Sequence, residues 1–328
     1  MKRANHLLPQ ILDRDNLYLA FWKARKSKDG YDYVAKYREN LEKNLDILSH
    51  QIVTSQVKVG DYTYFKIYDP KERLICAAAF EERVLHHALM NVCHANFEKY
   101  QIHDSYASRK HKGQYAALDR ATKFQQKYKW FLKLDVRRYF DSIHHQVLAQ
   151  LLSKRFKEKK LLAIFKQILD SYQTSEQRGL PIGNLTSQYF ANHYLATADH
   201  FIKEQLKIKA YVRYMDDMVL WHQDKTQLLE AGKRLSHFIR TQLKLVLKPF
   251  CLNKTHFGLP FLGYVVFKDK LHLNENSKKR FKKKLQLYNE YLKEEKWTEQ
   301  EYHKKIVPLL AFTQKAESKK FRQQCLQA

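Results

Sequence analysis

The stretch that decides the fold is residues 210–221, which read A-Y-V-R-Y-M-D-D-M-V-L-W. Two adjacent acids, Asp216 and Asp217, lie between short runs of aromatic, β-branched and aliphatic residues. This pattern predicts two strands joined by a tight turn, with apolar arms in a core and carboxylates at the tip. An isolated Asp-Asp pair is most often only a polar turn, so the pair does not establish a site by itself.

A third acid upstream changes this interpretation. Asp135 ends the apolar run W-F-L-K-L-D at residues 130–135, which predicts a buried strand with its carboxylate at the strand end. Mg²⁺ prefers oxygen ligands and is usually held by one or two carboxylates together with substrate phosphates. Two such ions about 3.5–4 Å apart can stabilise the attacking and leaving oxygens of a phosphoryl displacement. Acids on two neighbouring strands, Asp135 with Asp216 and Asp217, are what that chemistry requires.

Three ordered sequence boxes resemble those of reverse transcriptases. Residues 214–217, Tyr-Met-Asp-Asp, resemble the family's catalytic box, and Asp135 followed by Phe140 resembles its first metal-binding box. The segment G-L-P-I-G-N-L-T-S-Q at residues 179–188 lies between them, in the family's order. The resemblance covers about residues 64 to 264. It implies an α+β fold of the right-hand polymerase type, with fingers, a palm built on an antiparallel sheet, and a helical thumb.

We expect the fingers in residues 1–128, the palm in 129–268 and the thumb in 269–328, with part of 150–185 completing fingers and palm. The fingers are predicted to be mostly helical, with a β-hairpin near 62–78 whose turn is Asp69-Pro70-Lys71-Glu72. Apolar residues at helical spacing predict further helices over 80–100 and 225–247. The segment from Lys270 onward carries 15 Lys and Arg against 7 Asp and Glu, which suits a thumb that follows a phosphate backbone.

Composition points to a nucleic-acid partner. The 328 residues include 60 Lys and Arg against 34 Asp and Glu, a net charge of +26, although packaging proteins are basic too. The basic start lacks the apolar region of a secretory signal, and no run approaches the roughly 18 apolar residues of a membrane span, so no membrane partner is expected. The scattered cysteines lack metal-ligand spacing, which indicates reduced thiols and a cytoplasmic protein; they are Cys76, Cys93, Cys251 and Cys325.

The resemblance implies roles for further residues. The backbone carbonyl of Val136 would join the three acids as a ligand of two Mg²⁺ ions. Phe140 would lie under the sugar of the incoming deoxynucleoside triphosphate and exclude a 2′-hydroxyl, although a core aromatic explains this residue as well. Lys71 and Arg73 on the fingers hairpin would bind the triphosphate, although exposed charges on a turn are usually only solvated.

The remaining expected site residues are a candidate acid and the contacts of the nucleotide and of the template or primer. Lys254 is a candidate acid near the leaving pyrophosphate, with a surface lysine as the alternative. The residues expected at the nucleotide are Lys71, Arg73, Phe140, Ile182, Gly183 and Gln188. The residues expected at template or primer are Arg109, Tyr214, Met215, Lys254, Phe261, Leu262 and Gly263.

The middle box indicates a subfamily. Most reverse transcriptases have Pro-Gln-Gly where this chain has Pro-Ile182-Gly183, and the box ends Ser187-Gln188. Both features resemble the enzymes of diversity-generating retroelements, which copy a template-repeat RNA unfaithfully at adenines so that the cDNA rewrites a variable gene. Where an aliphatic side chain replaces the glutamine amide, one hydrogen bond to the nucleotide is lost. A net hydrogen bond of about 0.5–1.5 kcal/mol corresponds to a roughly two- to tenfold loss of discrimination between correct and incorrect nucleotides. This loss does not explain why adenine is the base that is miscopied.

The expected partners are the template-repeat RNA, the RNA/cDNA hybrid and a small oligomeric accessory variability protein. We expect no maturase, endonuclease or integrase domain in a chain of this length. Three alternatives remain: a retron-like or antiphage-defence reverse transcriptase, a non-catalytic RNA-binding protein, and an RNA-directed RNA polymerase, against which Phe140 argues.

Overall fold

The structure is a computed structural model that describes residues 2–68 and 71–327. Its helices are α1 (Leu8–Leu12), α2 (Arg14–Arg25), α3 (Asp32–Glu39), α4 (Leu41–Thr54), α5 (Phe80–Glu98), α6 (Gln114–Lys127), α7 (Tyr139–Ser142), α8 (His145–Ser153), α9 (Lys159–Asp170), α10 (Leu185–His200), η1 (Phe201–Gln205), α11 (Lys225–Gln242), η2 (Thr255–Phe257), α12 (Glu275–Lys293), α13 (Glu299–Gln314) and α14 (Lys319–Gln327). Its strands are β1 (Tyr62–Ile67), β2 (Arg73–Ala78), β3 (Trp130–Asp135), β4 (Ala210–Tyr214), β5 (Asp217–His222), β6 (Cys251–Lys254), β7 (Leu259–Phe261), β8 (Tyr264–Val266) and β9 (Leu271–Leu273).

The chain separates into two compact units, each built from three segments. The first unit comprises Met1–His103, Asp135–Leu206 and Arg234–Lys248, and the second comprises Asp104–Leu134, Lys207–Lys233 and Pro249–Ala328. The division into fingers, palm and thumb remains a prediction.

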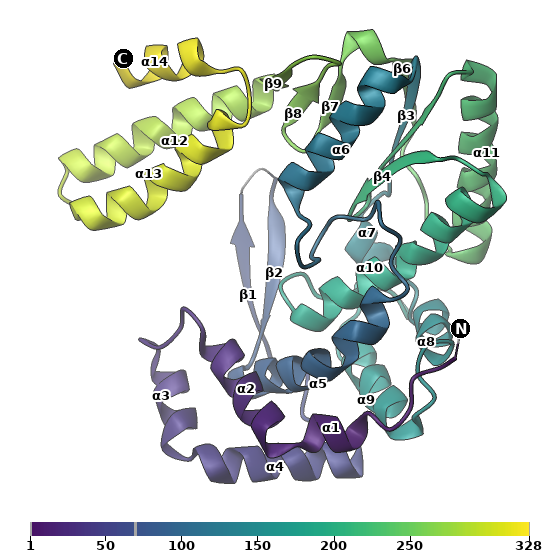
Figure 1. Cartoon of the computed structure of the whole chain (residues 1–328). Helices are drawn as coiled ribbons and strands as arrows, with labels where there is room; N and C mark the ends of the chain where they lie inside the picture. The colour runs from purple at the N-terminus through teal and green to yellow at the C-terminus, as the bar shows by residue number, and fades with distance from the viewer. Residues whose placement is uncertain (1, 69–70, 328) are drawn as a thin grey trace. The chain divides into compact units, whose positions relative to one another are not determined.

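Helices dominate the first unit. Helix α2 packs along α5 (Figure 1), because both present apolar side chains at helical spacing to the same core. Phe21 on α2 stacks on Tyr37 of α3 at a centroid distance of 5.8 Å, and Tyr37 meets Phe80 at the start of α5 at 5.1 Å. These ring contacts join α2, α3 and the start of α5.

A two-stranded antiparallel hairpin, β1–β2, belongs to the same unit. Its register runs from Tyr62 opposite Ala78 to Ile67 opposite Arg73. The strands correspond to those predicted near 62–78. Asp69 and Pro70 of the expected turn lie outside the described residues.

The second unit contains a four-stranded sheet with the strand order β4-β5-β3-β6. β4 pairs antiparallel with β5, and β3 pairs antiparallel with β6. The core of the sheet includes Phe131, Val212 and Trp221, and α6 packs against it through Leu118 and Phe124. Trp221 donates its indole N–H to the buried Gln125 side chain of α6, which donates in turn to the Val266 carbonyl. The long apolar runs of the sequence are therefore buried strands, as predicted.

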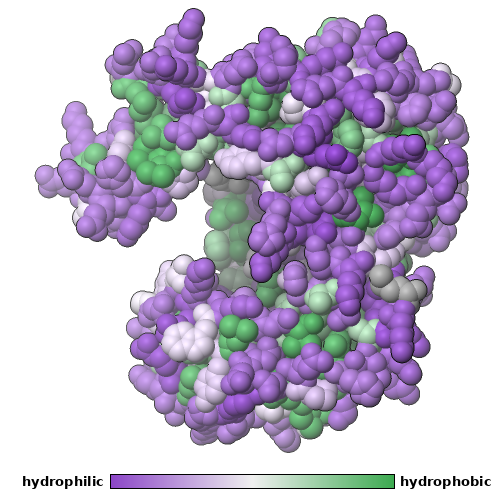
Figure 2. All heavy atoms as spheres, viewed as in Figure 1, coloured by the Kyte–Doolittle hydropathy of each residue, from purple (hydrophilic) through white to green (hydrophobic). Residues whose placement is uncertain are grey.

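A three-stranded meander, β7-β8-β9, and the C-terminal helices complete this unit. α12 and α13 pack through a small apolar core of Phe281, Leu285 and Ile306. Hydrophilic residues cover most of their visible face (Figure 2), in agreement with the run of lysines along α12.

No helix among the described residues is both long and apolar enough to cross a bilayer. All four cysteines of the chain are described and all are free thiols.

One predicted helix is shorter than expected. α11 ends at Gln242, whereas the apolar periodicity predicts a helix to 247. Lys244 has a φ of 53°, and Leu245 donates its backbone N–H to the Ile239 carbonyl. A left-handed residue ends a helix because the next N–H can no longer reach its helical acceptor.

Candidate active site

The β4–β5 hairpin presents the Asp216–Asp217 pair as predicted. Tyr214 lies opposite Asp217, so Met215 and Asp216 form a two-residue turn. Met215 has a φ of 55°, a left-handed conformation that a residue with a side chain adopts only when its surroundings hold it. Arg213, fully buried, supplies such a restraint by donating from Nη1 to the Met215 carbonyl at 3.0 Å. The turn is thus fixed by its buried arms.

Asp217 begins β5 and lies beside a lysine of the neighbouring strand. Lys133 Nζ on β3 lies 3.1 Å from Asp217 Oδ1 and also donates to the Pro260 carbonyl at 3.0 Å. The ammonium group partly neutralises the carboxylate. Sequence reasoning missed Lys133, which is a single polar position within an apolar run.

Asp135 ends β3, as predicted, and is held by a second lysine. Lys248 donates its backbone N–H to the Asp135 carbonyl at 2.9 Å, and its Nζ lies 2.7 Å from Asp135 Oδ2. Asp135 Oδ1 is buried and has no hydrogen-bond partner in the part of the chain that the structure describes. A buried carboxylate oxygen without a partner is costly unless a cation or donor joins it, so the Asp135 carboxylate fits a metal-ligand role.

The remaining first-box residues surround this strand end. Val136 is buried and forms a β-bridge with Leu247. Phe140 is half-buried on the short helix α7, and its carbonyl accepts a hydrogen bond from the Leu180 backbone N–H at 2.9 Å. Burial raises the pKa of the neighbouring Asp141 carboxyl, an effect that the positive charge of Arg138 partly offsets.

Within residues 2–68 and 71–327, no three His, Cys, Asp or Glu side chains are grouped closely enough to bind a metal ion. The predicted four-ligand set therefore remains a prediction.

The middle box lies against the β1–β2 hairpin. Cys76 on β2 donates its backbone N–H to the Ile182 carbonyl at 2.8 Å. Gly183 has a φ of 120°, and a Cβ placed there would lie 3.0 Å from Ile75 Cγ2 and 3.3 Å from the Cys76 carbonyl oxygen. Only glycine fits this backbone conformation and this close approach. Gln188 is exposed on the first turns of α10.

The expected triphosphate ligands are both exposed. Arg73 begins β2, opposite Ile67, and Lys71 lies in the connection that precedes it. The structure brings Arg73 onto the same hairpin that binds Ile182 through its backbone.

Arg109 lies in a loop that is attached to the β4–β5 hairpin. Tyr106 donates its backbone N–H to the Arg213 carbonyl at 2.9 Å, and Arg213 donates to the Asp104 carbonyl at 2.9 Å. The Arg109 guanidinium donates to the Ser105 carbonyl at 2.6 Å within the same loop. The loop therefore extends the edge of β4.

Lys254 and the Phe261-Leu262-Gly263 turn both belong to the second unit. Lys254 ends β6 and places its ammonium 5.6 Å from the Trp130 ring centroid. Leu262 and Gly263 both have positive φ, which makes them the two-residue turn of the β7–β8 hairpin. Ser277 at the start of α12 donates to the Gly263 carbonyl at 2.8 Å, so the turn is anchored to the C-terminal helices.

Comparison with known proteins decides the family. The family model for reverse transcriptase (RNA-dependent DNA polymerase) matches residues 68–266, which include both acidic boxes, the middle box and the Phe-Leu-Gly turn. The chain belongs to the reverse transcriptase family. Reverse transcriptase domains generally use divalent metal ions and deoxynucleoside triphosphates.

Two curated relatives of this reverse transcriptase come from yeasts. A putative COX1/OXI3 intron 1 protein of Saccharomyces cerevisiae is 22% identical over 217 residues, which are 62% of this chain and 26% of that protein. An uncharacterized 91 kDa protein in the cob intron of Schizosaccharomyces pombe is 34% identical over 84 residues, 24% of this chain and 10% of that protein. The chain thus spans about a quarter or less of the length of these relatives.

A solved structure agrees on the fold. Apo telomerase from Candida tropicalis matches with a TM-score of 0.51 and 12% identity, over 66% of this chain and 49% of that one. Together with the mixture of helices and antiparallel sheets, this likeness confirms the predicted α+β right-hand fold.

Proposed function

We propose that this reverse transcriptase is an active RNA-directed DNA polymerase that extends a primer on an RNA template. The observation that carries the proposal is the β4–β5 hairpin, whose buried arms hold Asp216 and Asp217 in a restrained turn inside the family-matched region. The fully buried Arg213 beneath the turn, which donates to the Met215 carbonyl, supports a functional turn, because a charged side chain is costly to bury.

The proposed ligands of two Mg²⁺ ions are Asp135, Asp216, Asp217 and the carbonyl of Val136. The partnerless Asp135 Oδ1 supports a cation at that carboxylate. Bound ions supply charge stabilisation for the attacking primer oxygen and the leaving pyrophosphate. The chain itself supplies positioning: rigid strands hold the acids, and Lys133 and Lys248 limit the repulsion between carboxylates.

The proposed nucleotide contacts come from the fingers hairpin and the middle box. Arg73 and Lys71 would bind the triphosphate, Arg73 with the bidentate geometry of a guanidinium. Phe140 would lie against the sugar and exclude a 2′-hydroxyl, which selects deoxynucleotides. The hydrogen bond from Cys76 to Ile182 supports a shared pocket, because it couples the two segments.

We further propose that the enzyme belongs to a diversity-generating retroelement. Ile182 in place of a glutamine and Gln188 at the end of the box support this subfamily. Its partners would be a template-repeat RNA, the RNA/cDNA hybrid and a small oligomeric accessory variability protein. Adenine-directed errors in the cDNA would distinguish it from other reverse transcriptases.

An enzyme that serves an intron RNA is the second candidate. The two yeast relatives described as intron proteins favour it. The two candidates differ in their products, because an intron enzyme would copy adenine as faithfully as the other bases.

The deciding experiment is primer extension on a heteropolymeric RNA template with the four deoxynucleoside triphosphates and Mg²⁺. We expect extension by the wild type and a loss of about 10²-fold or more in Asp216→Asn, with an unchanged circular dichroism spectrum. Asp269→Asn is the matched control, because it removes an equivalent charge from an exposed loop. Extension by Asp216→Asn at the wild-type rate would overturn the polymerase assignment. Sequencing of the cDNA separates the diversity-generating retroelement enzyme from the intron enzyme, because only the former would show errors concentrated at template adenines.

A further inference from the structure

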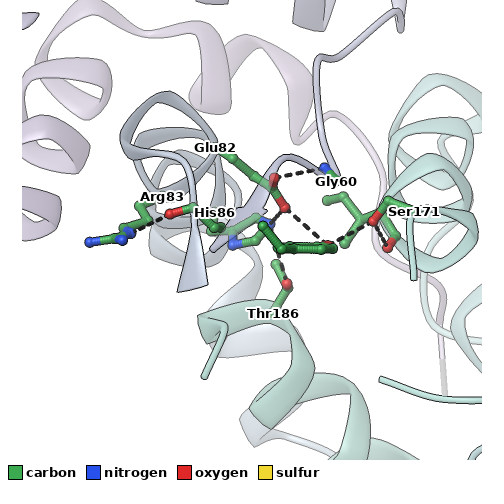
Figure 3. Close-up of polar contacts among 9 residues, drawn as sticks. Gly60, Glu82, Arg83, His86, Ser171 and Thr186 are labelled. Atoms are coloured by element: carbon green, nitrogen blue, oxygen red, sulfur yellow. Dashed lines mark hydrogen bonds and ion pairs between the residues drawn. The ribbon is translucent and has the colours of Figure 1, made fainter. Parts of the chain in front are cut away.

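A buried polar network lies at the base of the β1–β2 hairpin, and none of the catalytic, metal or nucleotide-binding residues proposed above belongs to it. Its centre is Glu82 on the first turn of α5, only 2% exposed, next to His86, which is 1% exposed. Figure 3 shows the Glu82 side chain between Gly60, His86 and the Ser171 region. A carboxylate in such a place is costly to bury, so its partners determine whether the local structure is stable.

The Glu82 carboxylate binds the first residues of the hairpin. Glu82 Oε2 accepts the Gly60 backbone N–H at 2.8 Å, and Oε1 accepts the Tyr62 hydroxyl at 3.4 Å. The Tyr62 hydroxyl also contacts Ser171 Oγ at 2.8 Å, at the end of α9. Burial raises the pKa of Tyr62, so this hydroxyl keeps its proton and remains a donor.

The same network reaches α10, whose first turn lies within the middle box. His86 Nε2 lies 3.3 Å from Glu82 Oε1 and 3.5 Å from Thr186 Oγ1, and Thr186 is fully buried in the first turn of α10. Arg83, the neighbour of Glu82, donates to the Ala78 carbonyl at the end of β2 at 2.7 Å. One helix turn of α5 therefore contacts the start of β1, the end of β2 and the start of α10.

We propose that Glu82 is a positioning residue for nucleotide binding, which holds the fingers hairpin and the middle box in register. This inference rests on the proposed function, because the hairpin carries Arg73 and the box carries Ile182 and Gly183. The Cys76–Ile182 hydrogen bond beside Gly183 directly links these two segments. Glu82 and His86 give a second attachment at the base of the hairpin, next to the Cys76 link, which limits the angle that the hairpin adopts against α10.

Three variants test the proposal. Glu82→Gln keeps the side-chain volume and an acceptor oxygen but removes the charge. Tyr62→Phe removes only the hydroxyl shared by Glu82 and Ser171. Glu81→Gln is the matched control, because the adjacent Glu81 is exposed on the same helix turn and loses the same charge.

The readout is single-nucleotide primer extension, with KM for the deoxynucleotide measured separately from kcat, and primer–template affinity measured alone. We expect Glu82→Gln and Tyr62→Phe each to raise this KM about three- to tenfold. The expected change in kcat is less than about twofold, and primer–template affinity and Glu81→Gln kinetics should match the wild type. A general folding defect would lower the active fraction, and hence kcat, without this selective rise in KM.

Amide hydrogen exchange tests the inference without measuring activity. Both variants should exchange faster than the wild type in residues 60–67 and 73–78 and in the first turn of α10, with other segments unchanged. If Glu82→Gln does not fold, Tyr62→Phe decides. Unchanged KM and unchanged exchange in Tyr62→Phe would overturn the inference, whereas an inactive wild type with faster exchange in the variants would overturn only the proposed function.

Discussion

Lys248 Nζ lies 2.7 Å from Asp135 Oδ2, so the carboxylate at the end of β3 is paired with an ammonium group. Lys133 Nζ likewise lies 3.1 Å from Asp217 Oδ1. Both pairs are partly exposed, and each contributes modestly to stability. Their larger effect is electrostatic, because an ammonium group on a proposed metal ligand competes with a divalent cation for the same oxygen.

Lys248→Gln should lower the Mg²⁺ concentration that gives half-maximal primer extension by about two- to fivefold. The physical reason is the loss of a competing cation worth up to ~1 kcal/mol at a partly exposed pair. A Mg²⁺ titration of the extension rate measures the change, and Lys268→Gln is a control for the loss of an exposed lysine. A higher Mg²⁺ requirement would show instead that Lys248 orients the Asp135 carboxylate.

Ile182→Gln should lower misincorporation opposite template adenine by roughly two- to tenfold, because an amide restores one hydrogen bond to the nucleotide pocket. Deep sequencing of cDNA made from one RNA template by the wild type and the variant measures the error rate at each template base. Ile182→Leu keeps an aliphatic side chain and should retain the wild-type pattern. Equal error rates in wild type and Ile182→Gln would remove this residue from the account of mutagenic copying.

Gly183→Ala should destabilise the protein by about 1–3 kcal/mol, because an L-residue is strained at a φ of 120° and its Cβ would press on Ile75 and the Cys76 carbonyl. Urea denaturation gives the free energy of unfolding. Gly30→Ala is the matched control, since no atom lies within 4 Å of a Cβ built at Gly30, and a change within about 0.5 kcal/mol is expected there. Equal effects of the two substitutions would contradict the close approach of the middle box to β2.

Stability should fall as the pH drops from about 6.5 towards 4, in part because of His193. Burial, partly opposed by a hydrogen bond to the Leu151 carbonyl, lowers the pKa of His193 to about 4. Between these pH values the unfolded chain binds a proton that the folded chain does not, so protonation favours unfolding, by up to about 1.4 kcal/mol per pH unit.

Urea denaturation at pH 7, 6 and 5 measures this slope. His193→Gln should flatten it, because the variant has no group to protonate at that site, whereas His303→Gln changes an exposed histidine and should leave the slope unaltered. A wild-type slope in His193→Gln would assign the acid sensitivity to other groups.

Local sequence patterns predicted the elements that carry the acids. Alternating and continuous apolar runs around residues 130–135 and 210–221 predicted β3, β4 and β5, because a buried strand requires apolar side chains wherever the chain is covered. The same reasoning overestimated the length of α11, because the apolar spacing continues beyond Gln242 whereas the backbone adopts a left-handed conformation at Lys244. Periodicity reports which side chains are buried, and a helix end depends on a backbone conformation that it does not encode.

The sequence by itself determined the order of the boxes and the acids that serve as candidate ligands, because these follow from short-range composition and spacing, and the resemblance of the boxes to those of reverse transcriptases implied the fold class. Only the tertiary structure decided which lysines neutralise Asp135 and Asp217, and which buried groups join the hairpin to α10. Lys248 is 113 residues from Asp135, and Thr186 is 100 residues from His86. Contacts over such separations depend on how whole elements pack, and no local pattern in the chain specifies them.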